Sequence, residues 1–331
     1  MNTIDDDVAS CPKTRKISGD ISERTIAVVG GFGWIGKLFR HYVNQLSINK
    51  KIKIINLSKQ TIKNFNSSND KIRDYLQSNE VVAIVNLAGG SYEGLYNQNC
   101  TDPSKAWLGD FELPRMLVKV VQNTGIELIH LSTGDVFDYH QIPSYSTNDC
   151  VFDENDLCNA VFQNDIRAPF FAGMKFNAEQ LIRIHPYHYI FRIKHPIDMI
   201  SNPKNLINIM LYDTVFPVAE ESITFLPDLF RAIVMVLLPD ESIPYGIYHV
   251  VVPDCDSLLD VAKSMKSFIG RSRLINWDFS TCSINEYINL IGQNISFSRL
   301  NSDKFLKIGG HLTPFDYIKD QVIPSVLNTI M

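Results

Sequence analysis

The chain has few cysteines and no long apolar run, and both absences narrow its class. Its six cysteines among 331 residues show no CxxC spacing. This argues against a zinc site or a dense disulfide framework and favours reduced thiols in the cytoplasm. No stretch of about 18 apolar residues occurs, so we expect no transmembrane helix and no membrane partner. The polar, acidic N-terminus lacks the apolar segment of a signal peptide.

An excess of positive charge is also absent. The chain has 31 Lys and Arg residues against 36 Asp and Glu residues, which gives a formal net charge of −5. A general nucleic-acid-binding protein normally has a basic stripe instead. Hydrophobic residues make up 45% and charged residues 20% of the chain, as in ordinary globular proteins. We therefore expect a cytoplasmic protein with no nucleic-acid partner.

Short apolar runs rich in β-branched residues alternate with segments of helical spacing. This alternation predicts right-handed βαβ units and a Rossmann-type α/β fold with a doubly wound parallel sheet. Strands are expected to begin near residues 25, 51, 81, 127 and 189, with helices over 113–122 and 176–184. We expect a flexible tail over 1–24, a dinucleotide-binding domain over 25–195, and a smaller C-terminal substrate-binding lobe over 196–331. Within that lobe, about 220–252 should return to the sheet.

A glycine-rich segment follows the first expected strand and precedes a helix, with the sequence Gly30-Gly-Phe32-Gly33-Trp34-Ile35-Gly36. In this GxxGxxG spacing the first glycine permits a tight turn. The second lets a pyrophosphate approach the backbone at the helix N-terminus, and the third lets the helix pack closely. Three glycines could form only a tight turn. Their place at the first βα crossover favours a dinucleotide site lined by this segment.

The end of the second strand bears on the choice between NADP and NAD. NAD binding usually needs an acidic residue about 20 positions beyond the glycines, but this strand ends in Asn56, Leu57, Ser58 and Lys59. A hydroxyl and a cation there could accept a 2′-phosphate, although Ser58 and Lys59 could equally form a solvated loop. The sequence favours NADP, with NAD as the alternative.

Separated motifs in a fixed order carry a family resemblance. They are Gly33-Trp-Ile-Gly36, Asn86-Leu87-Ala88-Gly89, Ser132-Thr-Gly-Asp-Val-Phe and Phe171-Ala-Gly-Met-Lys175. With them, the chain resembles an extended short-chain dehydrogenase/reductase over roughly residues 25–250. More narrowly, it is similar to dTDP-4-dehydrorhamnose reductases and nucleotide-rhamnose epimerase/reductases. The resemblance implies a nicotinamide cofactor beside Leu87, Ala88 and Gly89, a nucleotide-sugar substrate and a homodimer.

The resemblance also implies three catalytic residues, and this chain lacks one of them. In that family a Ser or Thr, a Tyr and a Lys four residues later carry the reduction, with the Tyr as proton donor. Thr133 and Lys175 match the first and third positions, but Phe171 stands at the Tyr position. The Lys would bind the nicotinamide ribose. Because phenylalanine has no ionisable proton, a general acid worth ~10²–10⁴-fold is missing.

Asp135 is the remaining candidate for acid–base chemistry. The epimerase branch has a Cys and a Lys where this chain has Asp135 and Ile209, and related dehydratases place a Glu base at the position of Asp135. Asp135 could instead only hydrogen-bond backbone in a turn, and Tyr139 and Tyr145 could also supply a proton. We predict Thr133, Lys175 and Asp135 as catalytic residues and no metal site.

The leading hypothesis is an NADP-dependent oxidoreductase that reduces a nucleotide-linked 4-keto-6-deoxysugar with an atypical proton donor. Two alternatives stay open. One is a catalytically lapsed NAD(P)-binding regulatory or interaction protein, because three expected chemical groups are missing. The other is a redox-neutral nucleotide-sugar epimerase or dehydratase that uses Asp135 as base.

Overall fold

A computed structural model describes most of the chain. The described residues are 23–46, 51–64, 68–89, 104, 107–139, 151–160, 170–238, 243–255, 257–272, 277–291 and 295–330. Most of the expected N-terminal tail, together with Tyr145, lies outside them. The first strand begins one residue earlier than expected. Arg24 opens the first strand, and its guanidinium lies 3.0 Å from the carboxylate of Glu127.

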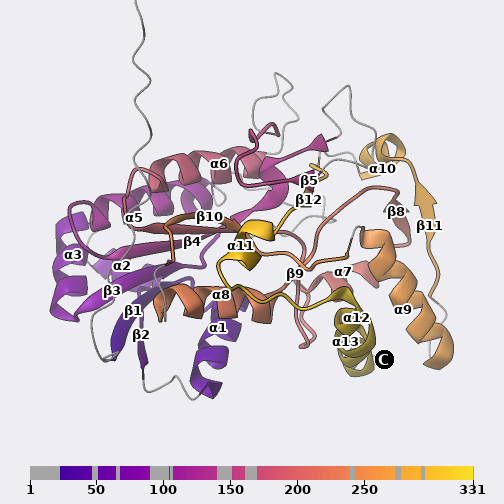
Figure 1. Ribbon diagram of the computed structural model, residues 1–331, viewed down its shortest axis with the longest axis horizontal. Helices are drawn as coiled ribbons and strands as arrows, with labels where there is room; N and C mark the ends of the chain where they lie inside the picture. Colours follow the sequence, from indigo (N-terminus) through magenta and orange to yellow (C-terminus); the bar gives the residue numbers. More distant parts are fainter. Residues whose placement is uncertain are drawn as a thin grey trace, which may run out of the picture.

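A six-stranded parallel sheet forms the centre of the molecule, in the order β10-β6-β4-β3-β1-β2 (Figure 1). This confirms the expected Rossmann-type α/β class. The strands are mostly buried because helices cover both faces of the sheet, and in β1 every residue is buried. The strands are β1 (Arg24–Val29), β2 (Ile52–Asn56), β3 (Val81–Asn86), β4 (Glu127–Thr133), β6 (His188–Ile193) and β10 (Gly246–His249).

Two groups of helices cover the sheet. On one face the sheet packs against α3, α5 and α6, and on the other against α1 and α8, as Figure 1 shows. A π-helical turn, η2 (Trp107–Glu112), leads directly into α5. The helices are α1 (Trp34–Gln45), α2 (Lys59–Asn64), α3 (Asn69–Ser78), α5 (Leu113–Val121), α6 (Phe170–Ile182) and α8 (Leu226–Leu237).

The segment that was expected to return to the sheet contains α8 and β10. Helix α8 packs on α1 through contacts of Phe230 with Phe39 and Tyr42, and β10 pairs with β6. The C-terminal part of the chain thus contributes an edge strand and a covering helix to the central sheet. The division at residues 195 and 196 stays a prediction.

Short elements, most of them after β6, pack beside the sheet around two further apolar cores. Three parallel strand pairs lie among them: β5 (Val151–Phe152) with β12 (Arg299–Leu300), β7 (Pro196–Ile197) with β9 (Thr224–Phe225), and β8 (Val215–Pro217) with β11 (Ser280–Cys282). The remaining helices are α7 (Leu206–Met210), α9 (Leu258–Ser272), α10 (Ile284–Ile291), α11 (Asp303–Lys307), α12 (Phe315–Tyr317), η5 (Ile318–Val322) and α13 (Ile323–Ile330).

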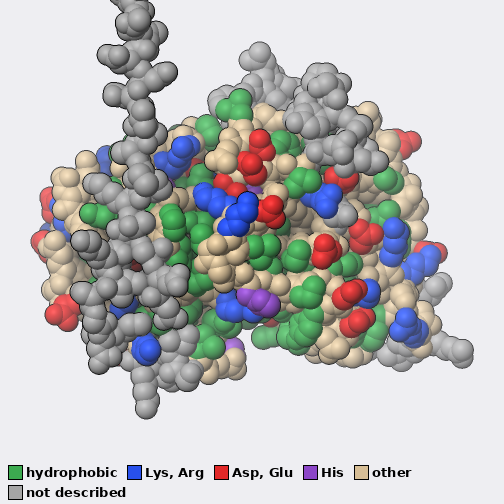
Figure 2. Space-filling view, viewed as in Figure 1, with side chains coloured by type: hydrophobic (Ala, Val, Ile, Leu, Met, Phe, Trp, Pro, Cys, Tyr) green, Lys and Arg blue, Asp and Glu red, His purple; other side chains and the backbone are tan. Residues whose placement is uncertain are grey.

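Acidic and basic side chains are interspersed on the molecular face in Figure 2. On that face, neither sign of charge forms a continuous stripe across the described surface. A search of the described helices finds none with the length and hydropathy needed to cross a bilayer. Charge and apolar side chains are thus spread over this face rather than concentrated.

Candidate functional site

The turn between β1 and α1 requires glycine at two positions. Gly30 has a φ of +78°, and a Cβ there would lie 2.5 Å from the backbone nitrogen of Ala88. A Cβ on Gly36 would lie 2.2 Å from the carbonyl oxygen of Gly30. Larger residues cannot occupy either position without moving backbone. The turn therefore brings the start of α1 against the residues that follow β3.

The N-terminus of α1 has no side-chain cap among the described residues. Gly33 is the N-cap and provides no side-chain hydrogen bond, and the first turn contains no acidic residue. Phe32 is exposed beside it, whereas Trp34 and Ile35 pack partly against the core. Free backbone N–H groups and the positive end of the helix dipole suit a phosphate group. The residues present thus fit a pyrophosphate-binding turn.

Asn56, the last residue of β2, and Arg40, in α1, flank the same turn. A Cβ on Gly31 would lie 2.4 Å from Oδ1 of Asn56, and this oxygen is buried without a hydrogen-bond partner among the described residues. The guanidinium of Arg40 lies 5.5 Å from the centre of the Phe32 ring. Arg40 was not among the predicted residues. Its signal was a basic side chain on the helix that follows the glycines.

Ser58 and Lys59 begin the next helix. The Ser58 hydroxyl accepts a hydrogen bond from the backbone N–H of Thr61 at 3.0 Å, so it caps α2. The side chain of Lys59 lies outside the described residues. Of the two, only Ser58 therefore has a described side chain, and its hydroxyl already has a structural role.

The residues after β3 lie over a buried polar cluster. The Asn86 amide donates to Nδ1 of His130 at 3.0 Å, and its oxygen accepts from the backbone N–H of Ala88 at 3.2 Å. Burial, together with the charge of Lys175, holds the pKa of His130 well below its usual value. The side chain of His130 is therefore neutral at pH 7. Leu87 is buried and Gly89 is exposed at this edge.

Lys175 is buried in α6 and makes an ion pair. Its Nζ lies 3.0 Å from the carboxylate of Asp110 in η2 and donates to the carbonyl of Leu131 at 3.2 Å. A Cβ on Gly89 would lie 3.0 Å from Asp110 and 3.6 Å from this Nζ. The amine thus faces the strand ends at the glycine-rich edge. Asp110 was missed, because its distance from Lys175 in the sequence gives no signal.

Helix α6 begins earlier than the sequence analysis placed it. The expected start at residue 176 would put Lys175 at the helix N-terminus, but α6 begins at Phe170 and Lys175 lies inside it. The Phe171 ring lies one turn before, with its centre 5.7 Å from the Lys175 amine. An apolar ring therefore lies next to the amine.

Thr133 and Asp135 lie together at the end of β4. The Thr133 hydroxyl donates to Oδ2 of Asp135 at 2.8 Å and accepts from the Asp135 backbone N–H at 3.2 Å. Asp135 belongs to the single turn η3 (Gly134–Val136). The backbone bond is the turn role considered for Asp135, but its carboxylate also makes further contacts.

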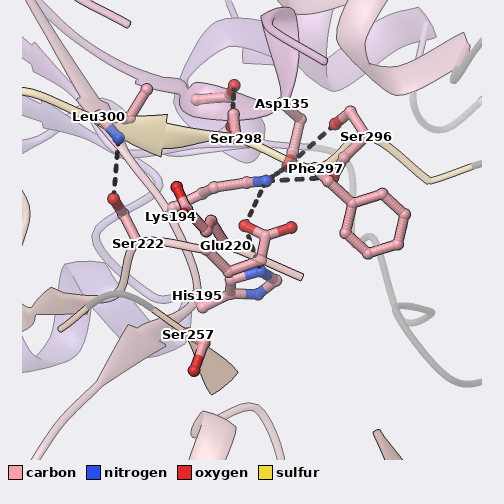
Figure 3. A network of polar contacts seen from close by, with 12 residues as sticks. Asp135, Lys194, His195, Glu220, Ser222, Ser257, Ser296, Phe297, Ser298 and Leu300 are labelled. Carbon is pink, nitrogen blue, oxygen red and sulfur yellow. Dashed lines mark hydrogen bonds and ion pairs between the residues drawn. The ribbon is translucent and has the colours of Figure 1, made fainter. Parts of the chain in front are cut away.

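A buried ammonium contacts that carboxylate from the end of β6. Lys194 Nζ lies 3.3 Å from Asp135 Oδ1 and 2.6 Å from Glu221 Oε2, and it donates to the carbonyl of Ser296 at 3.1 Å (Figure 3). His195, which has a φ of +40°, places Nε2 3.3 Å from the same Glu221 oxygen. Sequence reasoning missed these three groups. They come from separate segments that only the fold brings together.

The other candidate groups have structural partners. The Tyr139 hydroxyl accepts a hydrogen bond from the Glu220 N–H at 2.7 Å, and burial raises its pKa far above the usual value, so it is a poor proton donor. Ile209 lies in α7. Arg231, a basic side chain of α8, pairs with Asp228 one turn before it. Within the described residues, no group of three or more His, Cys, Asp or Glu side chains could hold a metal ion.

Comparison with known proteins identifies the family and the fold that this chain resembles. Residues 26–155 match the family described as "NAD dependent epimerase/dehydratase family". The chain has the extended short-chain dehydrogenase/reductase fold. This confirms the resemblance drawn from the motifs. No curated protein matches the sequence.

Solved structures extend the likeness over nearly the whole chain. A UDP-rhamnose synthase from Acanthamoeba polyphaga mimivirus aligns with a TM-score of 0.71 and 16% identity, covering 92% of this chain and 99% of the other. A dTDP-4-dehydrorhamnose reductase from Bacillus anthracis, in complex with NADP, gives 0.65 and 16%, covering 93% and 99%. A dTDP-glucose 4,6-dehydratase from the same organism, in complex with NAD, gives 0.65 and 15%, covering 92% and 96%. At this identity the likeness concerns the fold.

Proposed function

We propose that this protein is an NADP-dependent oxidoreductase of the extended short-chain dehydrogenase type that acts on a nucleotide-linked 4-keto-6-deoxysugar. One observation carries the proposal. The glycine turn at Gly30 and the buried amine of Lys175 meet the residues after β3 at one edge of the sheet. Ligands bind at this carboxyl edge in doubly wound folds. A homodimer in the cytoplasm is part of the same proposal.

The glycine turn would hold the cofactor's pyrophosphate, and Lys175 its nicotinamide ribose. Two features at the other end of the cofactor site support NADP. The strand β2 ends in Asn56 rather than a carboxylate, and the guanidinium of Arg40 lies beside the exposed ring of Phe32. A guanidinium is well suited to a 2′-phosphate. Bound NADPH would supply a hydride to the substrate carbonyl.

The proton would come through Thr133 and Asp135. Phe171 has no proton to donate, whereas the Thr133 hydroxyl is already hydrogen-bonded to Asp135 at 2.8 Å. The side chain of Asp135 is 27% exposed at the strand ends. A carboxylate with access to solvent can exchange protons while it remains in contact with Thr133. The two residues would thus form the acid–base group of the site.

The ion pair of Asp135 also supports a redox-neutral reaction as a second function. Lys194 lies 3.3 Å from Asp135, and a neighbouring ammonium favours the ionised carboxylate. An ionised carboxylate is a base, as elimination or epimerisation of a sugar requires. The experiment therefore has to distinguish reduction of the sugar from a redox-neutral conversion of it.

The test follows nicotinamide absorbance in mixtures of the protein, NADPH and a UDP- or dTDP-linked 4-keto-6-deoxysugar. We expect the natural protein to oxidise NADPH and Asp135→Asn to slow it by ~10²-fold, because the acid–base group is lost. The exposed Asp156 offers a matched control, Asp156→Asn, that should leave the rate unchanged.

A Phe171→Tyr variant restores the usual proton donor and separates the alternatives. Turnover only in this variant would identify a lapsed enzyme and overturn the reductase proposal. Sugar conversion without net NADPH oxidation, abolished by Asp135→Asn, would instead identify the redox-neutral reaction. Failure of the protein to bind either dinucleotide in calorimetry would contradict both functions.

A further inference from the structure

Lys194 is a lysine with almost no access to solvent, and it joins two carboxylates. Its side chain is 1% exposed, and that of Glu221 is 3% exposed. Asp135 contacts the same amine and is the most exposed member of the group. In Figure 3 the Lys194 side chain extends toward Asp135, and His195 lies on the side of the Lys194 amine that faces away from Asp135. The group therefore has a closed interior and one open end at Asp135.

The formal charges of this group do not balance. Asp135 and Glu221 contribute two negative charges and Lys194 one positive charge, so the sum is −1 when His195 is neutral. Neither ring nitrogen of His195 has a hydrogen-bond partner among the described residues, although Nε2 lies 3.3 Å from Glu221. The group therefore holds one more carboxylate than ammonium groups.

Fold stability alone does not account for such an arrangement. Burial lowers the pKa of Lys194, but the neighbouring Glu221 and Asp135 outweigh burial, and the pKa lies above its usual value. The amine is therefore a permanent cation. Buried ion pairs contribute little net stability, because desolvation offsets the attraction. Groups of this kind concentrate at functional sites.

We propose that Lys194, fixed by Glu221, is a positioning residue that holds the Asp135 carboxylate in contact with Thr133, so that these two residues take over the acid–base role that Phe171 cannot perform. This deepens the proposed function and rests on it. In the reductive direction NADPH would supply the hydride to the carbonyl carbon. The carbonyl oxygen would take a proton from solvent that Asp135 relays through the Thr133 hydroxyl. In a redox-neutral reaction Asp135 accepts the substrate proton and releases it to solvent.

Other charged and titratable groups near Asp135 and Lys194 also influence the pH dependence of the site. Glu220 lies next to Glu221 in the sequence, with its carboxylate 4.0 Å from Arg299. Tyr139 is bound to the Glu220 backbone and stays protonated. Ser296 also contacts Asp135, through its hydroxyl at 3.4 Å. Among the ion pairs of the described residues, Lys194 is the cation that contacts Asp135.

The first test detects the coupling without any need for turnover. We would label the lysine side chains with ¹³C and follow the Lys194 signal by NMR to pH 10.5 in the natural protein, Asp135→Asn and Glu221→Gln. We expect the signal to stay protonated in the natural protein and to titrate about 1 pH unit or more lower in each variant. An unchanged titration in Asp135→Asn would overturn the proposal, whatever reaction the enzyme performs.

The second test measures the pH profile of kcat/KM in Lys194→Met and Lys194→Arg. We expect Lys194→Met to lower kcat at least ~10-fold with little change in KM and to move the acidic limb upward by about 1 pH unit or more. Lys194→Arg, which keeps the charge, should restore most of the rate. The exposed Lys266 gives the control Lys266→Met, whose profile should match that of the natural protein.

The outcomes separate this inference from the proposed function. If Lys194→Met retains the natural profile and rate, the inference is wrong while the function stands. If no variant and no natural protein turns over either substrate class, the proposed function fails, and the NMR titration still decides the ion-pair coupling. Should Lys194→Met fail to fold, Lys194→Arg and Glu221→Gln carry the comparison, and an unaltered profile in Glu221→Gln then overturns the inference.

Discussion

The two ends of the candidate site are built by different means. At the β1–α1 turn the backbone forms the site, because Gly30 and Gly36 leave no room for a Cβ. Beside β4 and β6, buried charged side chains form it, through the pair of Lys175 in α6 with Asp110 in η2 and the pair of Lys194 with Glu221. The backbone end suits a ligand that needs close approach. The charged end suits proton transfer, and its stability depends on every charge keeping a partner.

The charged end should therefore be the more sensitive to a single substitution. Lys175→Met leaves the buried Asp110 without its ammonium partner, and breaking such a pair costs about 3–5 kcal/mol of unfolding free energy. Chemical denaturation measures this loss. The double variant Lys175→Met with Asp110→Asn should recover most of the stability but not the dinucleotide affinity. Recovery of both would show that Lys175 has only a structural role.

At the backbone end, Gly30→Ala should abolish cofactor binding with a smaller loss of stability. The added Cβ meets the Ala88 backbone at 2.5 Å in a left-handed conformation, and these strains cost about 2–4 kcal/mol. We expect calorimetry to show at least a ~100-fold weaker NADPH affinity. Gly125→Ala, at a position with nothing within 4 Å, is the control and should match the natural protein.

The same contrast explains how much could be predicted from the sequence. The glycine turn was predictable because its requirements are local, and the parallel α/β class followed from the alternation of apolar runs and helices. Asp110, Lys194 and Glu221 were not, because each partner lies in a distant segment. The early start of α6 was missed because Gly173 has a low helix propensity, and tertiary packing overrides it.

Cofactor choice offers a finer test of the backbone end. Arg40→Met removes the guanidinium beside Phe32, and the loss of one partly exposed phosphate contact should cost about 1–1.5 kcal/mol, or roughly tenfold in affinity. Titration with NADPH and NADH in parallel measures it. NADH, which has no 2′-phosphate, is the internal control. An equal loss of affinity for both dinucleotides would show that Arg40 does not contact the 2′-phosphate.

The smallest expected effect compares two buried histidines, His130 beside the Lys175–Asp110 pair and His249 at the end of β10. Burial lowers the pKa of His130, with Lys175 as the second cause, and that of His249, with Arg192 as the second cause. Both side chains are neutral in the folded protein. In the unfolded chain their pKa returns to about 6.5, so the unfolded chain binds protons more readily. Each histidine should thus remove about 1 kcal/mol of stability as the pH falls from 6.5 to 5.5.

Urea denaturation at both pH values measures these losses. His130→Gln and His249→Gln should each make the pH dependence shallower by that amount, and the double variant by the sum, because the two residues have different neighbours. A natural protein with no loss of stability between these pH values would contradict the burial of both as neutral groups. If His130→Gln alone removes the loss, the fold holds only the histidine beside the Lys175–Asp110 pair neutral. His249, at the end of β10, would then be accessible to protons from solvent in the folded protein.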